Sequence, residues 1–421
     1  MSIFWGVAAS LGVLLLAPHA EAVELIRVLL VQHTPRLTIK AERGVVVRLS
    51  SADERIVAGP LQITTGSSGI VINGLRVKSG IVRIRARRGD LTINTGSAPR
   101  LGQGRIPDKR PMIGRGKAAG TMTARDLASS PLGGSASLVV GGTAEVVSRG
   151  GSLSLVNELD IEEYVKGVVP SEMSAAWHPE ALKVQAVAAR TYALYQKMLN
   201  GGREYDVVAG TQDQVYRGRH GVDQRIHDAV EATRGLVVTY QNAPILAAFS
   251  STAAGPTEDA MTVWAKDLPY LKGVDCPFDE NSPYYQWRAK FMIDELEQAL
   301  RKQGQPVGTI ATLTPYSYSR AGRVDRVRIL HSEGELILRG QDLRKAVGYS
   351  VIPSTQFEIE ALGREIVLSG RGSGHAVGLC QWGAKEMAEH GHSYLSILRY
   401  YFPGTGLKPI RGLHRPPVPI P

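Results

Sequence analysis

Alternating apolar and polar positions mark the first part of the chain as rich in strands. Short runs of Val, Ile and Leu separated by Gly or Asn occupy residues 26–31, 45–49, 69–72 and 82–93, which is the pattern of strands joined by turns. The run V-R-I-R-A-R at residues 82–87 places three arginines on one face, because side chains alternate along a strand. That face fits either an anionic binding surface or an ordinary solvated one. Strand-like patterning resumes at residues 136–156.

The pattern changes after residue 158, where helices alternate with short strands. We predict helices at residues 158–169, 179–199, 294–303 and 386–401, and strands at 236–240, 245–250, 324–330 and 335–338. Pro179 suits the first turn of a helix, and Asn200-Gly201-Gly202 ends it. The chain therefore predicts an α+β fold of mixed helices and antiparallel strands, with a β-rich N-terminal module.

The first residues of the chain have the pattern of an export signal. An apolar run covers residues 4–17 and is followed by Ala20-Glu21-Ala22, the pattern of a signal peptide cleaved after residue 22. The run is short for a membrane span, which needs about 20 apolar residues. No Lys or Arg precedes it, so an uncleaved anchor is the alternative. We expect an exported protein of the periplasm or the extracellular cell wall.

The remaining chain divides by composition. Residues 98–118 are rich in Gly, Pro and basic residues without any period, as in a linker or an inserted loop. We expect a β-rich module at residues 23–97, a basic linker or insertion at 98–135, a region with the candidate chemistry at 136–406, and a Pro-rich tail at 407–421.

Composition narrows the classes of function. Of the 421 residues, 43% are hydrophobic and 21% charged, which excludes wholesale disorder and a coiled coil. Aromatic residues make up 6%, too few to favour an aromatic nucleic-acid platform. The net charge of +10 is uneven, because residues 1–150 carry +11 and residues 151–406 carry −4. We expect no nucleic-acid partner and a peripheral association of the basic segments with an anionic envelope.

One concentration of chemistry is the segment V-V-P-S-E-M, residues 168–173, with the helix that follows. Lys183 and Arg190 lie within an apolar helical run, and their spacing of seven puts them on one face. Buried cations need partners, since desolvating a lone charge costs several kcal/mol. Glu172 is a candidate partner. The alternatives are an internal salt bridge and a polar cleft.

The other concentration is the glycine-rich segment at residues 370–384, with His375 at its centre. It matches no dinucleotide, P-loop, H-E-x-x-H or G-x-S-x-G pattern. Such a histidine serves either packing or catalysis. Cys276 and Cys380 are the two cysteines of the chain, and a disulfide, half of a metal site and two unrelated thiols all remain open.

Four segments together resemble a known family. They read VVPSEMSAAWHPEALKVQAVAARTYALYQ, TQDQVYRG, VWAKDLPYL and GSGHAVGLCQWGAKEMAEHGHSYLSILRYYFPGT, and they are similar to the SpoIID/LytB family of stage II sporulation protein D. The resemblance spans roughly residues 26 to 407. It implies a lytic transglycosylase that cleaves the MurNAc–GlcNAc bond of peptidoglycan glycan strands, in some members only after their stem peptides are removed. The other branch implies a non-catalytic module that stimulates a cell-wall amidase, an N-acetylmuramoyl-L-alanine amidase.

The resemblance also implies a site. Glu172, the glutamate of P-S-E-M, would be the catalytic residue. The substrate-binding residues would be Lys183, Arg190, Tyr216, His375, Gln381 and Trp382, with Tyr216 and Trp382 either stacking on sugar rings or packing in the core.

Some positions depart from the family pattern. Ala376 and Cys380 alter the common G-H-G-V-G-M-S-Q-W-G-A, residues 249–255 lack the histidine of F-H-S-T-S-G-G, and Asp213 stands where a cysteine is common. We therefore expect no bound zinc and no cofactor.

Overall fold

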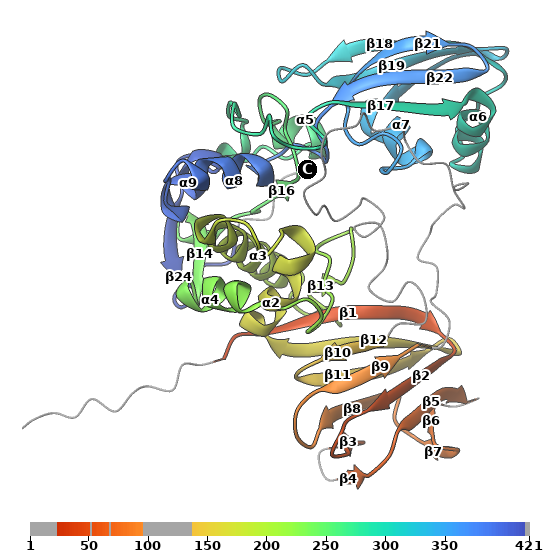
Figure 1. Ribbon diagram of the computed structural model, residues 1–421. Coiled ribbons are helices and arrows are strands. Elements are labelled where there is room, and N and C mark those ends of the chain that lie inside the picture. Colours follow the sequence, from red (N-terminus) through yellow and green to blue (C-terminus); the bar gives the residue numbers. More distant parts are fainter. Residues whose placement is uncertain (1–22, 51–52, 67–68, 96–136, 417–421) are drawn as a thin grey trace, which may run out of the picture.

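The computed structural model describes residues 23–50, 53–66, 69–95 and 137–416. The predicted signal peptide and the 98–135 segment lie outside the described residues. Three hydrophobic cores follow one another in space: the N-terminal sheets at the bottom of Figure 1, a helical part in the middle and a third part at the top.

The N-terminal part consists of two β-sheets that share one core. The seven-stranded sheet has the order β13-β1-β12-β11-β8-β3-β4, and the six-stranded sheet has the order β10-β9-β2-β5-β6-β7. The strands are β1 (Leu25–Thr34), β2 (Arg36–Lys40), β3 (Val45–Arg48), β4 (Glu54–Val57), β5 (Leu61–Gly66), β6 (Gly69–Ile72), β7 (Leu75–Val77), β8 (Ile81–Ala86), β9 (Leu91–Asn94), β10 (Leu138–Val140), β11 (Thr143–Arg149), β12 (Ser152–Asp160) and β13 (Val207–Val208).

Strands before residue 96 pair with strands after residue 136 in these sheets. β12 pairs with β1, β11 with β8, and β10 with β9, all antiparallel. Residues 137–160, which the sequence grouped with the region after the linker, therefore complete the N-terminal sheets. The run predicted at residues 82–93 is two strands in different sheets, with Gly89 at a φ of 76° in the turn between them.

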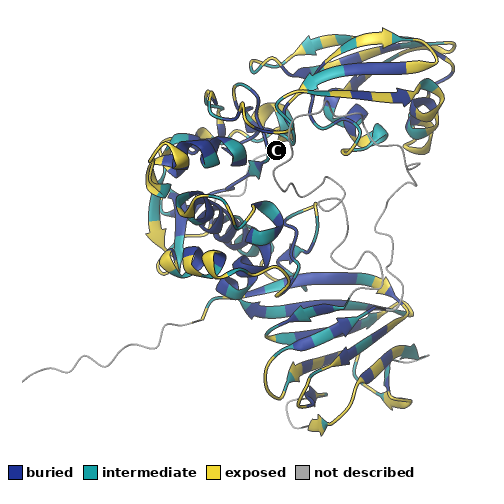
Figure 2. Ribbon diagram, viewed as in Figure 1, coloured by how far each residue is buried: buried dark blue, intermediate teal, exposed yellow. Residues whose placement is uncertain are grey.

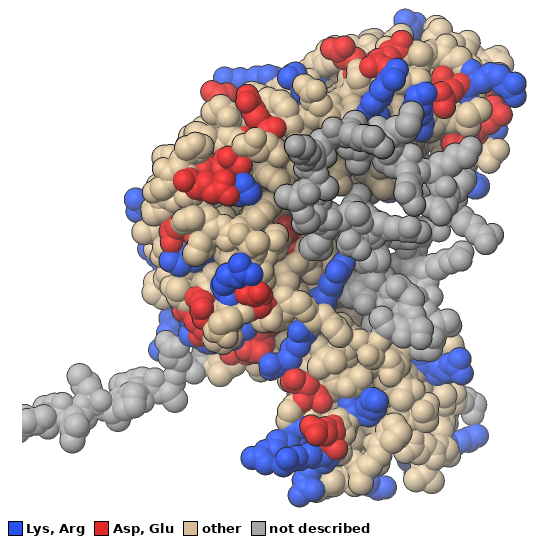
Figure 3. Space-filling model, in the orientation of Figure 1, with Lys and Arg blue, Asp and Glu red and all other residues tan. Residues whose placement is uncertain are grey.

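The arginine face of β8 is a solvated, ion-paired surface. Val82 and Ile84 are fully buried, whereas Arg83 bonds Glu145 at 2.8 Å and Arg85 bonds Glu54 at 3.0 Å. Acidic and basic side chains lie beside one another over this end of the molecule (Figure 3). The structure thus favours the solvated interpretation of this stripe.

The middle part packs helices around one long central helix, α3. The helices are α2 (Ile161–Glu172), α3 (Pro179–Leu199), α4 (Gln224–Ala232), α5 (Ala260–Trp264), the 3₁₀ helix η1 (Pro269–Leu271), α8 (Gln381–Glu389) and α9 (Tyr394–Tyr401). The strands are β14 (Leu236–Tyr240), β15 (Ala243–Pro244), β16 (Phe249–Ser250), β23 (Leu379–Cys380) and β24 (Gly406–Pro409). Most of α3 is buried (Figure 2), which explains its apolar sequence.

Two predicted elements differ here. The helix predicted at 386–401 is two helices, because Gly391 adopts a φ of 86° and Ser393 caps α9. Of the strand predicted at 245–250, only β16 is a strand, and it pairs with β23 in parallel. The antiparallel hairpin partner of β14 is β15.

The third part has its own hydrophobic core, and the sequence analysis did not distinguish it from the rest of residues 136–406. Its strands are β17 (Trp287–Met292), β18 (Ile310–Tyr318), β19 (Val324–His331), β20 (Gly334–Arg339), β21 (Gln356–Leu362) and β22 (Glu365–Arg371), and its helices are α6 (Ile293–Lys302) and α7 (Gly340–Val347). All its strand pairs are antiparallel. The fold is α+β, as predicted. No helix in the described part of the chain has both the length and the apolar character needed to cross a bilayer.

Candidate active site

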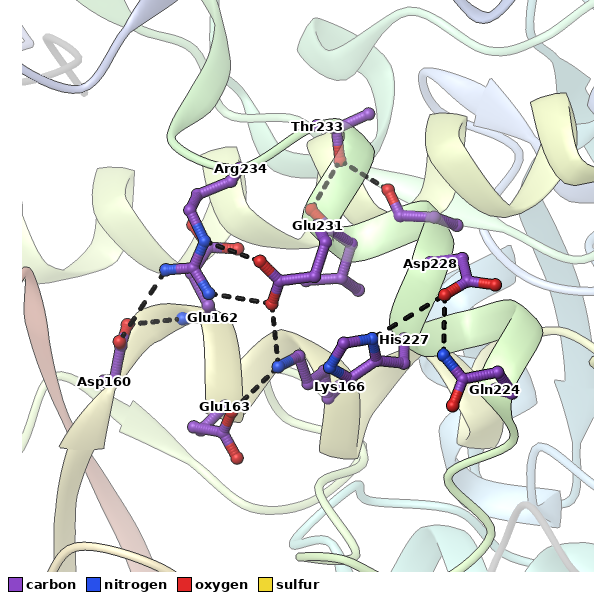
Figure 4. Close-up of polar contacts among 12 residues, drawn as sticks. Asp160, Glu162, Glu163, Lys166, Gln224, His227, Asp228, Glu231, Thr233 and Arg234 are labelled. Atoms are coloured by element: carbon purple, nitrogen blue, oxygen red, sulfur yellow. Dashed lines mark hydrogen bonds and ion pairs between the residues drawn. The ribbon is translucent and has the colours of Figure 1, made fainter.

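Glu172 is the last residue of α2, and the helix is held firmly on both sides. Asp160 caps its start by accepting from the Glu162 backbone N–H at 2.9 Å, and its apolar face lies in the N-terminal core. On its polar side, Lys166 bonds Glu163 and Glu231, both at 2.9 Å (Figure 4). The Lys166–Glu231 bond joins α2 to α4 and so helps to fix where α2 ends, whereas Glu163 lies on α2 itself.

The Glu172 carboxyl meets three other segments. The Gln381 side-chain amide, at the start of α8, donates to Glu172 Oε2 at 3.3 Å and to Gln185 Oε1 of α3 at 3.4 Å. The Val215 backbone also forms a hydrogen bond with the Glu172 carboxylate. Segments 209 residues apart in the chain thus converge on this one group.

Burial gives Glu172 an unusual acidity. The residue is half-buried, and desolvation of its carboxyl raises the pKa to about 7, against the smaller lowering effects of Gln381, Val215 and Arg217. Among the described residues, the groups that shift this pKa include no second carboxylate. Glu172 is therefore a single carboxyl that exchanges its proton near neutral pH.

Residues close in sequence to Glu172 and Gln381 form an aromatic pair and part of a groove. The rings of Trp177 and Trp382 meet edge to face with centroids 5.2 Å apart, and both residues are half-buried. A groove of about 340 Å³ lies along the end of α2, and its lining includes Ser171, Arg217 and His220. Glu172 adjoins this groove in sequence but does not line it.

Arg190 has a partner other than the one we expected. Its side chain is fully buried and forms a bidentate pair with Glu162, with Nε–Oε1 at 2.9 Å and Nη2–Oε2 at 2.6 Å. Glu162 and Glu172 are ten residues apart on α2, which is about 15 Å of helix. The pairing of Arg190 with Glu172 was wrong, and the internal salt bridge is what the structure contains.

Lys183 and Tyr216 also make contacts that do not involve Glu172. Lys183 bonds Glu180 at 2.6 Å and lies over the Tyr394 ring. Tyr216 is 1% exposed, stacks on Tyr164 and donates to Asn157 Oδ1 at 3.3 Å. The phenol ring is enclosed in the core, so the interpretation of Tyr216 as a sugar platform is corrected to packing.

His375 is held as a neutral ring. Its Nδ1 accepts from the Val377 backbone N–H at 3.0 Å, and the ring meets Trp264 edge to face at 4.9 Å. Burial, helped by Arg344 and Arg323, lowers its pKa to about 3. These contacts join the ring to its own loop and to α5, and they suit the packing interpretation.

Of the predicted residues, Gln381 bonds Glu172 and Trp382 follows Gln381 in the sequence, and the structure adds Gln185, Trp177 and Arg217. Gln185 is a polar residue inside the apolar run of α3, which is a visible signal in the sequence. Trp177 lies directly between the P-S-E-M segment and α3, but its partner Trp382 comes from the other end of the chain.

The two cysteines lie together with an acid. Cys276, Asp279 and Cys380 are all buried, and their ligand atoms lie within 4.8 Å of one another. Both thiols are free, and burial raises the pKa of the Cys380 thiol. The interpretation as two unrelated thiols is thereby excluded. Asp213, the position noted for its missing cysteine, instead accepts from Tyr192 and from the Val208 backbone N–H.

Comparisons with known proteins agree with this layout. The family model "Stage II sporulation protein" matches residues 149–240, which include Glu172, and a domain of unknown function, DUF8618, matches residues 264–378. Stage II sporulation protein D of Bacillus subtilis (strain 168) is 37% identical over 268 residues, covering 59% of this chain and 75% of that protein. An uncharacterized protein of Brachyspira hyodysenteriae is 34% identical over 257 residues, covering 61% of this chain and 68% of that one. The amidase enhancer of Bacillus subtilis (strain 168) is 30% identical over 291 residues, covering 58% of this chain and 40% of the enhancer. The chain belongs to the SpoIID family of stage II sporulation proteins.

Proposed function

We propose that this protein is a lytic transglycosylase that cleaves the MurNAc–GlcNAc bond of peptidoglycan glycan strands, with Glu172 as its acid and base. The supporting observation is the lone carboxyl whose pKa is raised to about 7. A group with that pKa is protonated in a large fraction of molecules at neutral pH and still loses its proton readily.

One carboxyl is sufficient for this reaction. Most glycosidases use a carboxylate pair, one member of which activates water or attacks the sugar. In a transglycosylase reaction the C6 hydroxyl of MurNAc takes that role: its oxygen bonds to C1, the glycosidic bond breaks, and a 1,6-anhydro ring forms. Glu172 gives its proton to the departing oxygen and then accepts the proton of the C6 hydroxyl, so it ends the cycle as it began.

The neighbours of Glu172 suit this role. Gln381, which donates to Oε2, orients the carboxyl and favours its ionised form after proton transfer. Trp177 and Trp382 offer aromatic surface for the apolar faces of sugar rings. Arg190 holds α3 against the start of α2, away from Glu172, whereas Lys183 pairs with Glu180 within α3.

The proposal includes the compartment. Peptidoglycan lies outside the cytoplasmic membrane, so the protein must be exported, as the apolar run at residues 4–17 predicts. Association with the envelope would then be peripheral, through the basic segments.

The test is Glu172→Gln in purified protein, incubated with glycan strands stripped of peptides by an amidase. We expect anhydro-muramyl ends from wild type and a loss of at least about 100-fold in the variant, because general acid–base catalysis contributes that much or more. Glu163→Gln, on the same helix, is the matched control and should retain activity. A Glu172→Gln protein that forms anhydro ends at the wild-type rate would rule out Glu172. Intact and stripped strands, compared side by side, show which substrate is used.

A second function has one specific observation in its favour, the 30% identity to an amidase enhancer. Under this alternative the protein binds a cell-wall amidase and raises its rate without cutting glycan itself. Wild type that forms no anhydro ends on either substrate, yet accelerates peptide release by the amidase, would favour the enhancer.

A further inference from the structure

The cluster of Cys276, Asp279 and Cys380 is unusual for its enclosed carboxylate. Asp279 is 0% exposed. Its Oδ2 accepts from the Ala254 backbone N–H at 2.8 Å and contacts Cys380 Sγ at 3.2 Å. Its Oδ1 is buried without a hydrogen-bond partner among the described residues. A buried carboxylate is costly unless a cation or several donors satisfy it.

The surroundings of the cluster supply one positive charge. Arg323, 3% exposed, donates to the Ala253 carbonyl and interacts electrostatically with Glu258 and, less strongly, with Cys380 and Asp279. Its Nε and Nη1 have no hydrogen-bond partner among the described residues. Polar groups here are thus enclosed and only partly satisfied, although native cores usually satisfy such groups.

Against the expectation from the sequence that no zinc is bound, we propose that Cys276, Asp279 and Cys380 bind a divalent metal ion of the zinc type. Zinc prefers thiolate sulfur at about 2.3 Å and carboxylate oxygen at about 2.0–2.2 Å, so its ligand atoms lie roughly 3.5–4 Å apart around the ion, within the span of this cluster. Two residues separate Cys276 from Asp279 in the sequence C-P-F-D, which is the spacing of the C-x₂-C pairs that bind zinc. The metal ion gives the unpartnered Oδ1 of Asp279 a binding partner.

The fourth position goes to a water or to the Tyr401 hydroxyl, which lies 3.2 Å from Cys276 Sγ. The ion displaces the protons of two thiols, which pass to solvent, and no electron is transferred. Two thiolates and one carboxylate against the ion leave −1, and the buried Arg323, which interacts most strongly with Glu258, adds a positive charge near this cluster.

The site would tie the start of α8 to the loop that follows η1. Cys380 is the N-cap of α8, and its Sγ accepts from the Gly383 backbone N–H at 3.4 Å. The next residue, Gln381, bonds Glu172. The metal is therefore structural and positions Gln381 at a distance. This inference concerns ligand chemistry and does not depend on the proposed glycan cleavage.

The test is metal content. The full chain is purified in reducing buffer, incubated with Zn²⁺, desalted and measured by elemental mass spectrometry. We expect one zinc per chain, less than a tenth of that in Cys276→Ser and Cys380→Ser, and reduced retention in Asp279→Asn. Asp275→Asn, an exposed carboxyl beside Cys276, is the matched control and should keep full occupancy. Co²⁺ should give a thiolate-to-cobalt charge-transfer band that either serine variant weakens.

A second readout is stability. Free Zn²⁺ at about a hundred times Kd should raise Tm by roughly 5 °C in wild type, and a chelator should reverse the rise. Circular dichroism checks that each variant is folded. Full zinc occupancy in both serine variants would overturn the proposal, because the ion would then lie elsewhere. So would reduced wild type that retains no zinc and forms a Cys276–Cys380 disulfide on exposure to a disulfide oxidant.

Discussion

At the scale of single residues, the protonation of Glu172 is coupled to the stability of the fold. Its pKa is about 7 in the folded protein, and an ordinary glutamate in an unfolded chain has a pKa near 4.3. Below pH 4 both states hold the proton and the group has no effect on stability. As pH rises toward 7 the unfolded state loses its proton first, so the wild type loses stability, and the loss is complete above pH 7.

Glu172→Gln removes this dependence. We expect the variant to match wild type near pH 4 and to exceed it at pH 8 by at most about 4 kcal/mol. Urea unfolding at the two pH values, followed by the signal of the helical part, measures the difference. The same difference at pH 4 and pH 8 would contradict the raised pKa.

The identity of Glu172 could be predicted from the sequence, whereas its surroundings could not. A resemblance points to the glutamate in P-S-E-M, but the partner of a buried charge depends on how helices align in space. Lys183 and Arg190 share a helix face with the correct spacing, and yet Arg190 reaches the first turn of α2 instead of its last. Tyr216 shows the same limit, since an aromatic residue in a motif suits both a core and a sugar platform.

At the scale of elements, the Arg190–Glu162 pair clamps α3 to the start of α2. Arg190 also donates to the carbonyls of Leu236 and Val230, so one guanidinium joins α2, α3, α4 and β14. Buried pairs of this kind add little over an apolar pair, but breaking one is costly because the remaining charge stays buried.

Arg190→Met should therefore destabilise the helical part by about 3–5 kcal/mol. The double variant Arg190→Met with Glu162→Gln should recover part of that loss. Lys183→Met, which breaks a partly exposed pair on the same helix, is the control and should cost less than about 1 kcal/mol. Thermal or urea unfolding compares the four proteins, and equal losses for Arg190 and Lys183 would show that burial of the pair is unimportant.

Elements with strong local signals were predictable. The bounds of α3 agree with the prediction at both ends, because Pro179 and Asn200-Gly201 mark them in the sequence. The split between α8 and α9 was missed because Gly391 within an apolar pattern gives only a weak breaking signal.

At the scale of the whole molecule, the sheets depend on pairing between strands that are distant in the chain, which local sequence patterns do not predict. β10, β11 and β12 read as strands from the sequence, but their partners lie across residues 96–136. The residues of the third core follow the same α+β pattern as the helical part. The sequence therefore did not predict that they form a separate hydrophobic core.

The same pairing makes the basic segment removable. β9 and β10 are antiparallel neighbours, with Leu138 opposite Ile93, so the chain leaves the sheet and returns to it at adjacent positions. Residues 98–118 carry six basic residues and one aspartate, half of the net charge of +10. Their deletion removes charge while leaving every described strand intact.

We expect this deletion to weaken binding to purified, anionic cell walls several-fold at low salt. The difference should shrink at about 0.5 M salt, where screening acts within about 4 Å. Cleavage of short soluble glycans should be unchanged, because Glu172 and its neighbours lie in a part of net charge −4, residues 151–406. A full-length variant with the six basic residues replaced by Gln separates charge from length and should behave like the deletion. If both bind walls as wild type does, the positive charge of this segment has no role in holding the protein to the envelope.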